Sequence, residues 1–159
     1  GIDISVDINL VGTENADNLT NNLLPVTVSA LGGNDTITNQ AAFATLDGGV
    51  GNDTIVNHGA KVLFEYEKGH GNDVIYGFRA DSSLKIAGDI YSTTRSDADI
   101  IVHVGDEEIN LVNANALEKI NIIGFTNAIS GTKKADKLVG TSGYDSINRL
   151  AGNDTLDGG

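Results

Sequence analysis

The sequence predicts an all-β protein: a right-handed parallel β-roll of 18-residue coils, then an antiparallel β cap, then the start of a second β-roll. A glycine-rich turn that runs into an Asp recurs in register, with Asp17, Asp35 and Asp53 spaced 18 residues apart and Asp73 following after 20. Each Asp is followed by alternating polar and apolar residues, which is typical of half-buried strands. Glycine is abundant, with 20 residues, and no helical apolar stripe persists. A fixed period of this kind indicates a solenoid.

The first roll is expected over residues 1–78, with two short strands in each coil. One strand follows the Asp turn and the other lies about nine residues further on. Their inward positions are apolar in every coil: Leu19, Ile37, Ile55 and Ile75 in the first strand, and Leu10, Val28, Leu46 and Phe64 in the second. Asn21, Asn39 and Asn57 also share one phase, which predicts a ladder of side-chain amides at the turn opposite the Asp residues.

The period stops near residue 79, and residues 79–127 are expected to form the cap. Separate strands are predicted at 83–87, 90–94, 99–104, 108–112 and 119–123. The links Ala87-Gly88-Asp89 and Gly105-Asp106-Glu107 have the composition of turns in antiparallel hairpins. A cap is required because the open end of a solenoid exposes unpaired strand edges and its apolar interior.

The pattern returns over residues 128–159 with a step of nine, in Asp136, Asp145 and Asp154. Nine is half of the earlier period, so both sides of these coils would carry an acidic turn, with Asp136 and Asp154 on one side and Asp145 on the other. The last residues, Leu156-Asp157-Gly158-Gly159, read as the opening of a further repeat. We therefore expect the chain to be a piece of a longer protein, monomeric as a fragment.

Composition excludes several function classes. The formal net charge is −12, from 22 acidic and 10 basic residues, which argues against nucleic acid or an anionic membrane as a partner. Cysteine is absent, so disulfides and thiolate metal sites are excluded. No apolar run approaches the roughly 20 residues of a membrane helix, so no membrane insertion is expected. No nucleophile elbow, phosphate loop or zinc-spaced histidine pair occurs, and we expect no catalytic residues and no enzyme activity.

The acidic turns suit calcium. Ca²⁺ takes about six to eight oxygen ligands and tolerates irregular geometry, and glycine lets the backbone aim carbonyl groups inward. One Asp per turn is too few for a site, so each ion should bridge neighbouring coils, between Asp17 and Asp35, Asp35 and Asp53, and Asp53 and Asp73. The predicted metal-binding residues are Asp17, Gly32, Gly33, Asp35, Gly49, Gly51, Asp53, Gly69, Gly71, Asp73, Asp136, Asp145 and Asp154.

Some of these sites are expected to be weak. The turn Gly12-Thr13-Glu14-Asn15-Ala16-Asp17 has no inner glycine and should form only in part. Lys133 and Lys134 lie in the turn before Asp136 and would oppose a cation, and Asp145 has no partner 18 residues further on.

Residues 48–56, Gly-Gly-Val-Gly-Asn-Asp-Thr-Ile-Val, resemble the RTX, or haemolysin-type, calcium-binding nonapeptide repeat G-G-x-G-x-D-x-U-x, in which U is a large aliphatic residue. Residues 30–38, 68–76 and 149–157 match it in part. The resemblance implies a parallel β-roll, calcium held by the Asp side chains and turn carbonyls, and export by a type I system to the cell surface or medium. Every second nonapeptide of 8–64 has lost its Gly and Asp, which argues against calcium on the far side of the roll.

Three functions follow as hypotheses. The favoured one is a calcium-binding structural module of a larger exported adhesin or surface protein, folded by Ca²⁺ bridging its coils at about 0.1–1 mM, with a cell-surface glycan or another surface protein as partner. The second is a carbohydrate-binding module, which needs an exposed aromatic platform. The candidates for that platform are Tyr66, Tyr76, Tyr91 and Tyr144. The third is an accessory repeat region of a secreted enzyme such as a protease, lipase or epimerase.

Overall fold

The computed structural model describes residues 9–22, 25–87, 91–124, 127–130, 132–139, 145–148 and 151–157. Within these ranges the regular elements are strands, apart from one 3-10 turn, η1 (Ala114–Ala116). No helix in the described part of the chain is long and apolar enough to cross a membrane. The strands are β1 (Leu10–Val11), β2 (Asn18–Asn21), β3 (Thr27–Ser29), β4 (Thr36–Asn39), β5 (Thr45–Asp47), β6 (Thr54–Asn57), β7 (Leu63–Glu67), β8 (Asp73–Tyr76), β9 (Ser83–Ala87), β10 (Tyr91–Arg95), β11 (Ile100–Val104), β12 (Glu107–Val112), β13 (Asn121–Ile123), β14 (Asn127–Ser130), β15 (Lys137–Val139), β16 (Asp145–Asn148) and β17 (Thr155–Asp157).

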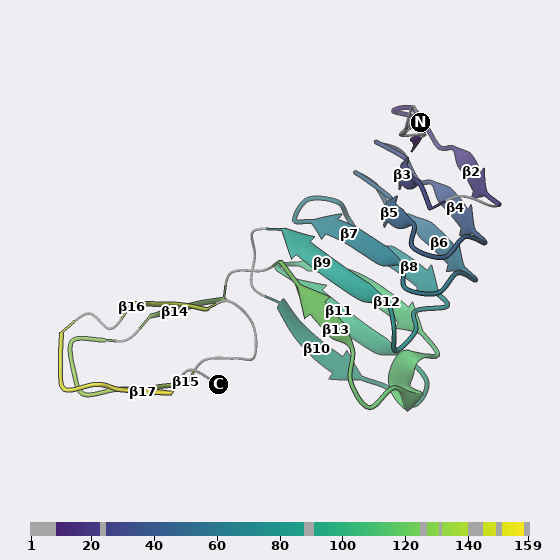
Figure 1. Ribbon diagram of the computed structural model, residues 1–159. Coiled ribbons are helices and arrows are strands. Elements are labelled where there is room, and N and C mark those ends of the chain that lie inside the picture. Colours follow the sequence, from purple (N-terminus) through teal and green to yellow (C-terminus); the bar gives the residue numbers. More distant parts are fainter. Residues whose placement is uncertain are drawn as a thin grey trace, which may run out of the picture.

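The described residues between 9 and 123 wind into a parallel solenoid with two facing sheets, which confirms the predicted fold class (Figure 1). One sheet has the order β1-β3-β5-β7-β9-β13 and the other the order β10-β11-β12-β8-β6-β4-β2. Each strand pairs with the equivalent strand of the next coil: Leu19 lies beside Ile37, and Val28 beside Leu46. Parallel pairing follows from the period because consecutive strands lie in different sheets.

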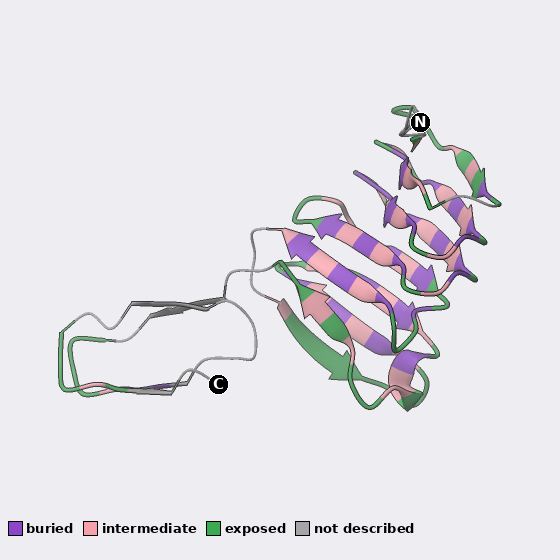
Figure 2. Cartoon of the chain, viewed as in Figure 1, coloured by how far each residue is buried: buried purple, intermediate pink, exposed green. Residues whose placement is uncertain are grey.

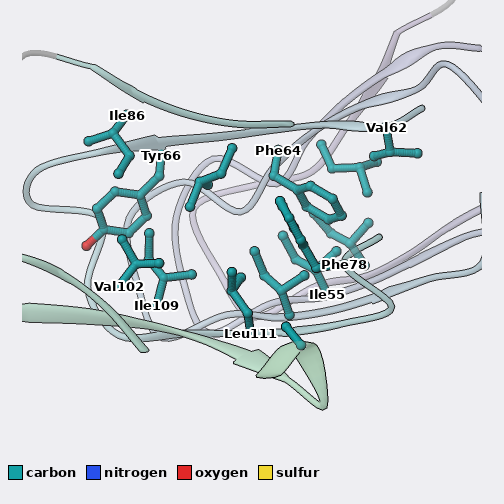
Figure 3. Close-up of a cluster of buried hydrophobic side chains, with 14 of the residues drawn as sticks. Ile55, Val62, Phe64, Tyr66, Phe78, Ile86, Val102, Ile109 and Leu111 are labelled. Carbon is teal, nitrogen blue, oxygen red and sulfur yellow. The ribbon is translucent and has the colours of Figure 1, made fainter. Parts of the chain in front are cut away.

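The core is a narrow apolar seam between the sheets. Inward residues such as Ile37, Leu46 and Ile86 are fully buried, while their neighbours along each strand are half-buried, and Figure 2 shows this alternation. Aromatic side chains fill part of this seam, and the Phe64 and Phe78 rings lie 5.5 Å apart between their centroids (Figure 3). Period-two alternation is what a strand with one buried face requires.

The predicted asparagine ladder is present on the side of the roll away from the Asp turns. The Asn21 Nδ2 group donates to Asn39 Oδ1, and the Asn39 Nδ2 group donates to Asn57 Oδ1, both at 2.8 Å. The Asn57 amide ends the ladder on the Gly77 carbonyl at 3.1 Å. All three asparagines are buried, so the ladder satisfies amides that would otherwise be costly inside the protein.

The region after residue 79 continues the roll, which corrects part of the predicted cap. Strand β12 pairs parallel with β8, and β13 pairs parallel with β9, so together they form a further coil. The hairpin predicted at Ala87-Gly88-Asp89 is wrong, because β9 pairs with β7 and β13. The hairpin at Gly105 is confirmed, with Val104 opposite Glu107 and β10–β11–β12 antiparallel.

The reason for this difference is an insertion of one coil length. Asn72 and Glu108 are stacked neighbours although they are 36 residues apart in the chain. Stacked turns in the earlier coils are 18 residues apart, so β10 and β11 account for the extra coil length. Strand β10 is exposed at the sheet end (Figure 2). An insertion of this size hides the period from sequence inspection. The domain boundaries at residues 78 and 127 stay predictions.

The second roll has the predicted pairing. Strand β14 is parallel to β16, and β15 is parallel to β17, with Leu138 beside Leu156. Asp136 and Asp154 therefore share one side of this roll, while Asp145 begins β16 in the other sheet.

Candidate metal centre

The Asp turns owe their shape to residues in the left-handed region of backbone space. Gly33, Gly51 and Gly71 form one column of such residues, with φ of 116°, 148° and 97°. A Cβ at Gly51 would collide with the Gly33 carbonyl oxygen, and a Cβ at Gly71 would collide with that of Gly51. The repeated glycine is therefore required both by φ and by the close approach of successive turns.

A second column combines Leu31, Gly49 and Gly69, with φ of 73°, 82° and 98°. The predicted ligand Gly32 is not part of it. Gly32 pairs with Val50 and donates its N–H to the Thr13 carbonyl at 3.1 Å. The left-handed position of this turn belongs to Leu31, which has 40% of its surface exposed.

The aspartates stack through their carboxylates. Asp17 N–H donates to Asp35 Oδ1 at 2.7 Å, and Asp35 N–H donates to Asp53 Oδ1 at 2.8 Å. Asp53 N–H continues the column to Asp73 Oδ1 at 3.0 Å. Asp35, Asp53 and Asp73 are 2%, 1% and 5% exposed, so this column of charge lies inside the turns.

Beside this column runs a second amide ladder that the sequence analysis missed. Asn52 N–H donates to Asn34 Oδ1 and Asn72 N–H to Asn52 Oδ1, both at 2.9 Å. Glu108 N–H then donates to Asn72 Oδ1 at 2.8 Å, which joins β12 to the last acidic turn. The signal was the Asn that precedes Asp35, Asp53 and Asp73 in the sequence.

Two carboxylate oxygens in this column of aspartates have no hydrogen-bond partner. Asp35 Oδ2 and Asp53 Oδ2 are buried without a hydrogen bond. Asp53 Oδ2 faces the backbone of Gly48, where a Cβ would collide with it. A buried carboxylate that is not fully paired is costly, and a cation beside it removes that cost.

The electrostatics of the column favour neutralisation. Burial raises the pKa of Asp53 to about 6, although the N–H of Asp35 acts in the opposite direction. Burial likewise raises the pKa of Asp73 to about 8, with the Asp53 charge adding to the effect. Both shifts mean that ionising these aspartates is unfavourable when no cation is bound, because burial removes water from the carboxylates and neighbouring carboxylates repel each other.

These residues fit a hard divalent cation that prefers oxygen ligands. Within the described ranges no three acidic or histidine side chains gather around one point. An ion would therefore combine carboxylate oxygens from successive turns with backbone carbonyls. Ca²⁺ accepts such a ligand set because it tolerates mixed oxygen donors and irregular geometry.

A carboxylate from β12, in the coil that follows the hairpin, binds the turn that precedes Asp73. Glu107 Oε2 accepts the Gly69 N–H at 2.8 Å and lies 2.9 Å from Tyr66 Oη, which itself lies 2.6 Å from the Gly71 carbonyl oxygen. The hydrogen bond from Gly69 lowers the pKa of Glu107. Sequence reasoning placed Glu107 in a hairpin turn and gave it no role in the site.

The second roll repeats the column in part. Asp136 N–H donates to Asp154 Oδ1 at 3.0 Å, and both residues are half-buried. Gly152 has φ of 138° above the Lys134 carbonyl, as Gly51 does above Gly33. The side chain of Asp145 lies outside the described residues.

Comparison with known proteins agrees with this geometry. The family model of the RTX calcium-binding nonapeptide repeat matches residues 45–56 and 130–159, in four copies. The crystal structure of the extracellular lipase LipA from Serratia marcescens is similar, with a TM-score of 0.61 and 23% sequence identity over 71% of this chain and 20% of the lipase. The chain thus spans about a fifth of that protein. No curated protein sequence matches the chain significantly.

Proposed function

We propose that the chain, parts of which match the RTX calcium-binding nonapeptide repeat, is a structural module whose folding is completed by Ca²⁺ held between successive coils. The observation that supports this proposal most directly is that two buried oxygens, Asp35 Oδ2 and Asp53 Oδ2, have no hydrogen-bond partner in the stacked turns.

The proposed ions lie between neighbouring acidic turns on one side of the roll. Asp35, Asp53 and Asp73 supply carboxylates, and carbonyl groups around Gly33, Gly51 and Gly71 supply further oxygens. The opposite side is closed by the Asn21–Asn39–Asn57 ladder. Calcium therefore acts on one edge of the coils only.

Calcium would make folding conditional. The carboxylates are stacked one coil apart and repel each other, and the seam between the sheets is thin. A cation that binds the stacked turns and not the unfolded chain adds its binding free energy to folding. Extracellular calcium modules work at about 0.1–1 mM, where this coupling switches the module on outside the cell.

The test is a calcium titration followed by far-UV circular dichroism and calorimetry on the full chain. We expect little β structure in excess chelator, and β content that rises with calcium together with the heat of binding. The D53N variant should need more calcium for the same signal. The Q40A variant is the matched control, because Gln40 is exposed and lies away from the Asp turns. Full β structure in chelator would contradict the proposal.

We propose further that the module belongs to a larger exported adhesin or surface protein and is itself non-catalytic. An accessory region of a secreted enzyme is the second candidate, and it is favoured by the similarity to part of an extracellular lipase. Activity assays on the chain and on its full-length parent separate the two, since the second candidate predicts an active parent.

The carbohydrate-binding alternative has little support in the described residues. Tyr66 is 3% exposed and its hydroxyl contacts Glu107, so it cannot offer a flat ring to a sugar. Tyr76 is 44% exposed, Tyr91 is half-buried, and Tyr144 lies outside the described residues. A glycan-binding screen with a Y76A control would detect a sugar site.

A further inference from the structure

The turns that open the two rolls have similar sequences. They are Gly12-Thr13-Glu14-Asn15-Ala16-Asp17 and Gly131-Thr132-Lys133-Lys134-Ala135-Asp136, which share Gly, Thr, Ala and Asp at equivalent positions. In both turns a threonine occupies the position that Gly49 and Gly69 occupy in the later turns.

Each threonine binds the carboxylate of its own turn. Thr13 donates its N–H to Asp17 Oδ2 at 2.6 Å, and its Oγ1 hydroxyl donates to the same oxygen at 2.8 Å. Thr132 does the same to Asp136 Oδ2, at 2.6 Å and 2.9 Å. The hydroxyl also accepts a backbone N–H, from Asn15 in one turn and Lys134 in the other, both at 3.2 Å.

The interior turns lack this arrangement. At the threonine position they have Leu31 and Gly49, which are left-handed and carry no hydroxyl group. Asp35 Oδ2 and Asp53 Oδ2 are consequently without a partner. Among the described residues, Thr13 and Thr132 are not left-handed. The carboxylate oxygen left without a partner in the interior turns is, in the opening turns, already bound twice by the chain.

We propose that the hydrogen bonds from Thr13 and Thr132 occupy the carboxylate oxygen in the opening turn of each roll and so prevent calcium from binding there. Asp17 and Asp136 are then structural residues and not ligands. Calcium binding then begins at the second acidic turn of the first roll. This inference rests on the proposed function and changes its expected ligand set. It restricts the bridging sites of the first roll to those between Asp35 and Asp53 and between Asp53 and Asp73.

The physical reason is competition for one oxygen. A cation at Asp17 Oδ2, the oxygen that is unpartnered in the interior turns, must first displace both Thr13 donors, and charge-assisted hydrogen bonds of this kind are among the stronger ones. The opening turn also lacks the second left-handed position, because Asn15 stands where Gly33 and Gly51 stand in later coils. Its carbonyl groups are therefore not arranged as they are in the later turns. In the second roll, Lys133 and Lys134 add positive charge.

The test counts calcium ions by isothermal titration of the full chain and its variants. D17N and D136N should bind the same number of ions as the parent, with midpoints within about twofold. D53N should lose at least one ion or shift the midpoint about tenfold or more. A loss of one ion in D17N or D136N would overturn the proposal.

A gain-of-site variant keeps the test decisive if D53N folds poorly. The double change T13G and N15G converts the opening turn to Gly-Gly-Glu-Gly-Ala-Asp, and we expect it to bind one ion more than the parent. T13S keeps the hydroxyl and is the matched control, with an unchanged count. An unchanged count in the double variant would overturn the role of Thr13. If the parent binds no calcium, the proposed function fails as well, whereas an ion lost only from D17N removes this inference alone.

Discussion

Asp53 holds Asp35 through one carboxylate oxygen and leaves the other without a partner. The Asp35 N–H donates to Asp53 Oδ1 at 2.8 Å, while Asp53 Oδ2 is buried with no hydrogen bond. One half of the carboxylate thus stacks the coils, and the other half is free to bind a cation. The Asp53 carboxylate therefore both stabilises the stacking of the coils and offers an oxygen to a cation.

Replacing Gly51 with alanine should destabilise the calcium-loaded roll strongly. Its φ is 148° and a Cβ would collide with the Gly33 carbonyl, so both the backbone and the neighbouring turn must move. We expect a loss of about 2–5 kcal/mol in the free energy of unfolding, from left-handed strain of about 1–2 kcal/mol together with a steric clash of about 1–3 kcal/mol. Denaturant unfolding in saturating calcium measures it.

G69A is the control for that experiment. Gly69 has φ of 98°, but nothing lies within 4 Å of the position of its Cβ. It should therefore lose only the backbone term of about 1–2 kcal/mol. Equal losses in G51A and G69A would show that the approach of neighbouring turns does not determine stability.

Removing the middle of the asparagine ladder should weaken the roll without changing calcium binding. The N39A variant removes the buried hydrogen bonds that Asn39 makes with Asn21 and Asn57 and should cost about 1–3 kcal/mol. Thermal unfolding in saturating calcium reads the stability, and calorimetry reads the ion count. A lower ion count in N39A would contradict the separation of the two edges of the coil.

Acid should favour the metal-free roll. The pKa of Asp53 is raised by burial to about 6, and that of Asp73 to about 8, from the ordinary aspartate value of 3.8. The folded state therefore binds protons more tightly than the unfolded state. Folding becomes more favourable as pH falls from about 8 toward 4, and this stabilisation is lost again as pH rises through the folded-state pKa values.

Circular dichroism in excess chelator measures this effect, and we expect β content to increase between pH 8 and pH 5. With calcium present the trend should reverse, because protons compete with the ion for the same carboxylates. D53N should show a smaller response in chelator. A metal-free protein that loses β structure over this acid range would contradict the burial of the column.

The E107Q variant should loosen the last acidic turn. Glu107 accepts the Gly69 N–H and contacts the Tyr66 hydroxyl, so loss of its charge should cost about 1–2 kcal/mol. E108Q is the matched control, because that side chain is exposed and contacts only His103 among the charged groups described. Denaturant midpoints in calcium compare the two, and a larger loss in E108Q would show that the role of Glu107 is wrong.

Local repetition made much of this structure predictable. The spacing of Asp17, Asp35 and Asp53 sets the coil length, and the alternation around Ile37 and Ile55 sets the inward face. The asparagine ladder followed from the same phase. In a solenoid, residues one period apart are neighbours, so a one-dimensional pattern specifies three-dimensional contacts.

The sequence did not predict the features at which the 18-residue period is interrupted, nor those that the period alone cannot specify. The β10–β11 hairpin adds one coil length to the usual spacing between β8 and β12, so the parallel continuation was not visible in the chain. Glu107 reaches the Gly69 turn only because β12 stacks there. The hydrogen bonds from Thr13 to Asp17 are local in sequence. Their importance became clear only by comparison with Asp35 and Asp53, whose Oδ2 atoms have no hydrogen-bond partner.

The sequence by itself therefore determined the coil, its two strands, its acidic and amide edges, and its suitability for calcium, because each of these depends on residues at a constant spacing. Only the tertiary structure decided that the roll continues past residue 79, which carboxylate oxygens lack a hydrogen-bond partner and which turns have their carboxylate bound by a threonine. Those properties depend on hydrogen-bond direction and on contacts across an insertion, and a spacing rule contains neither.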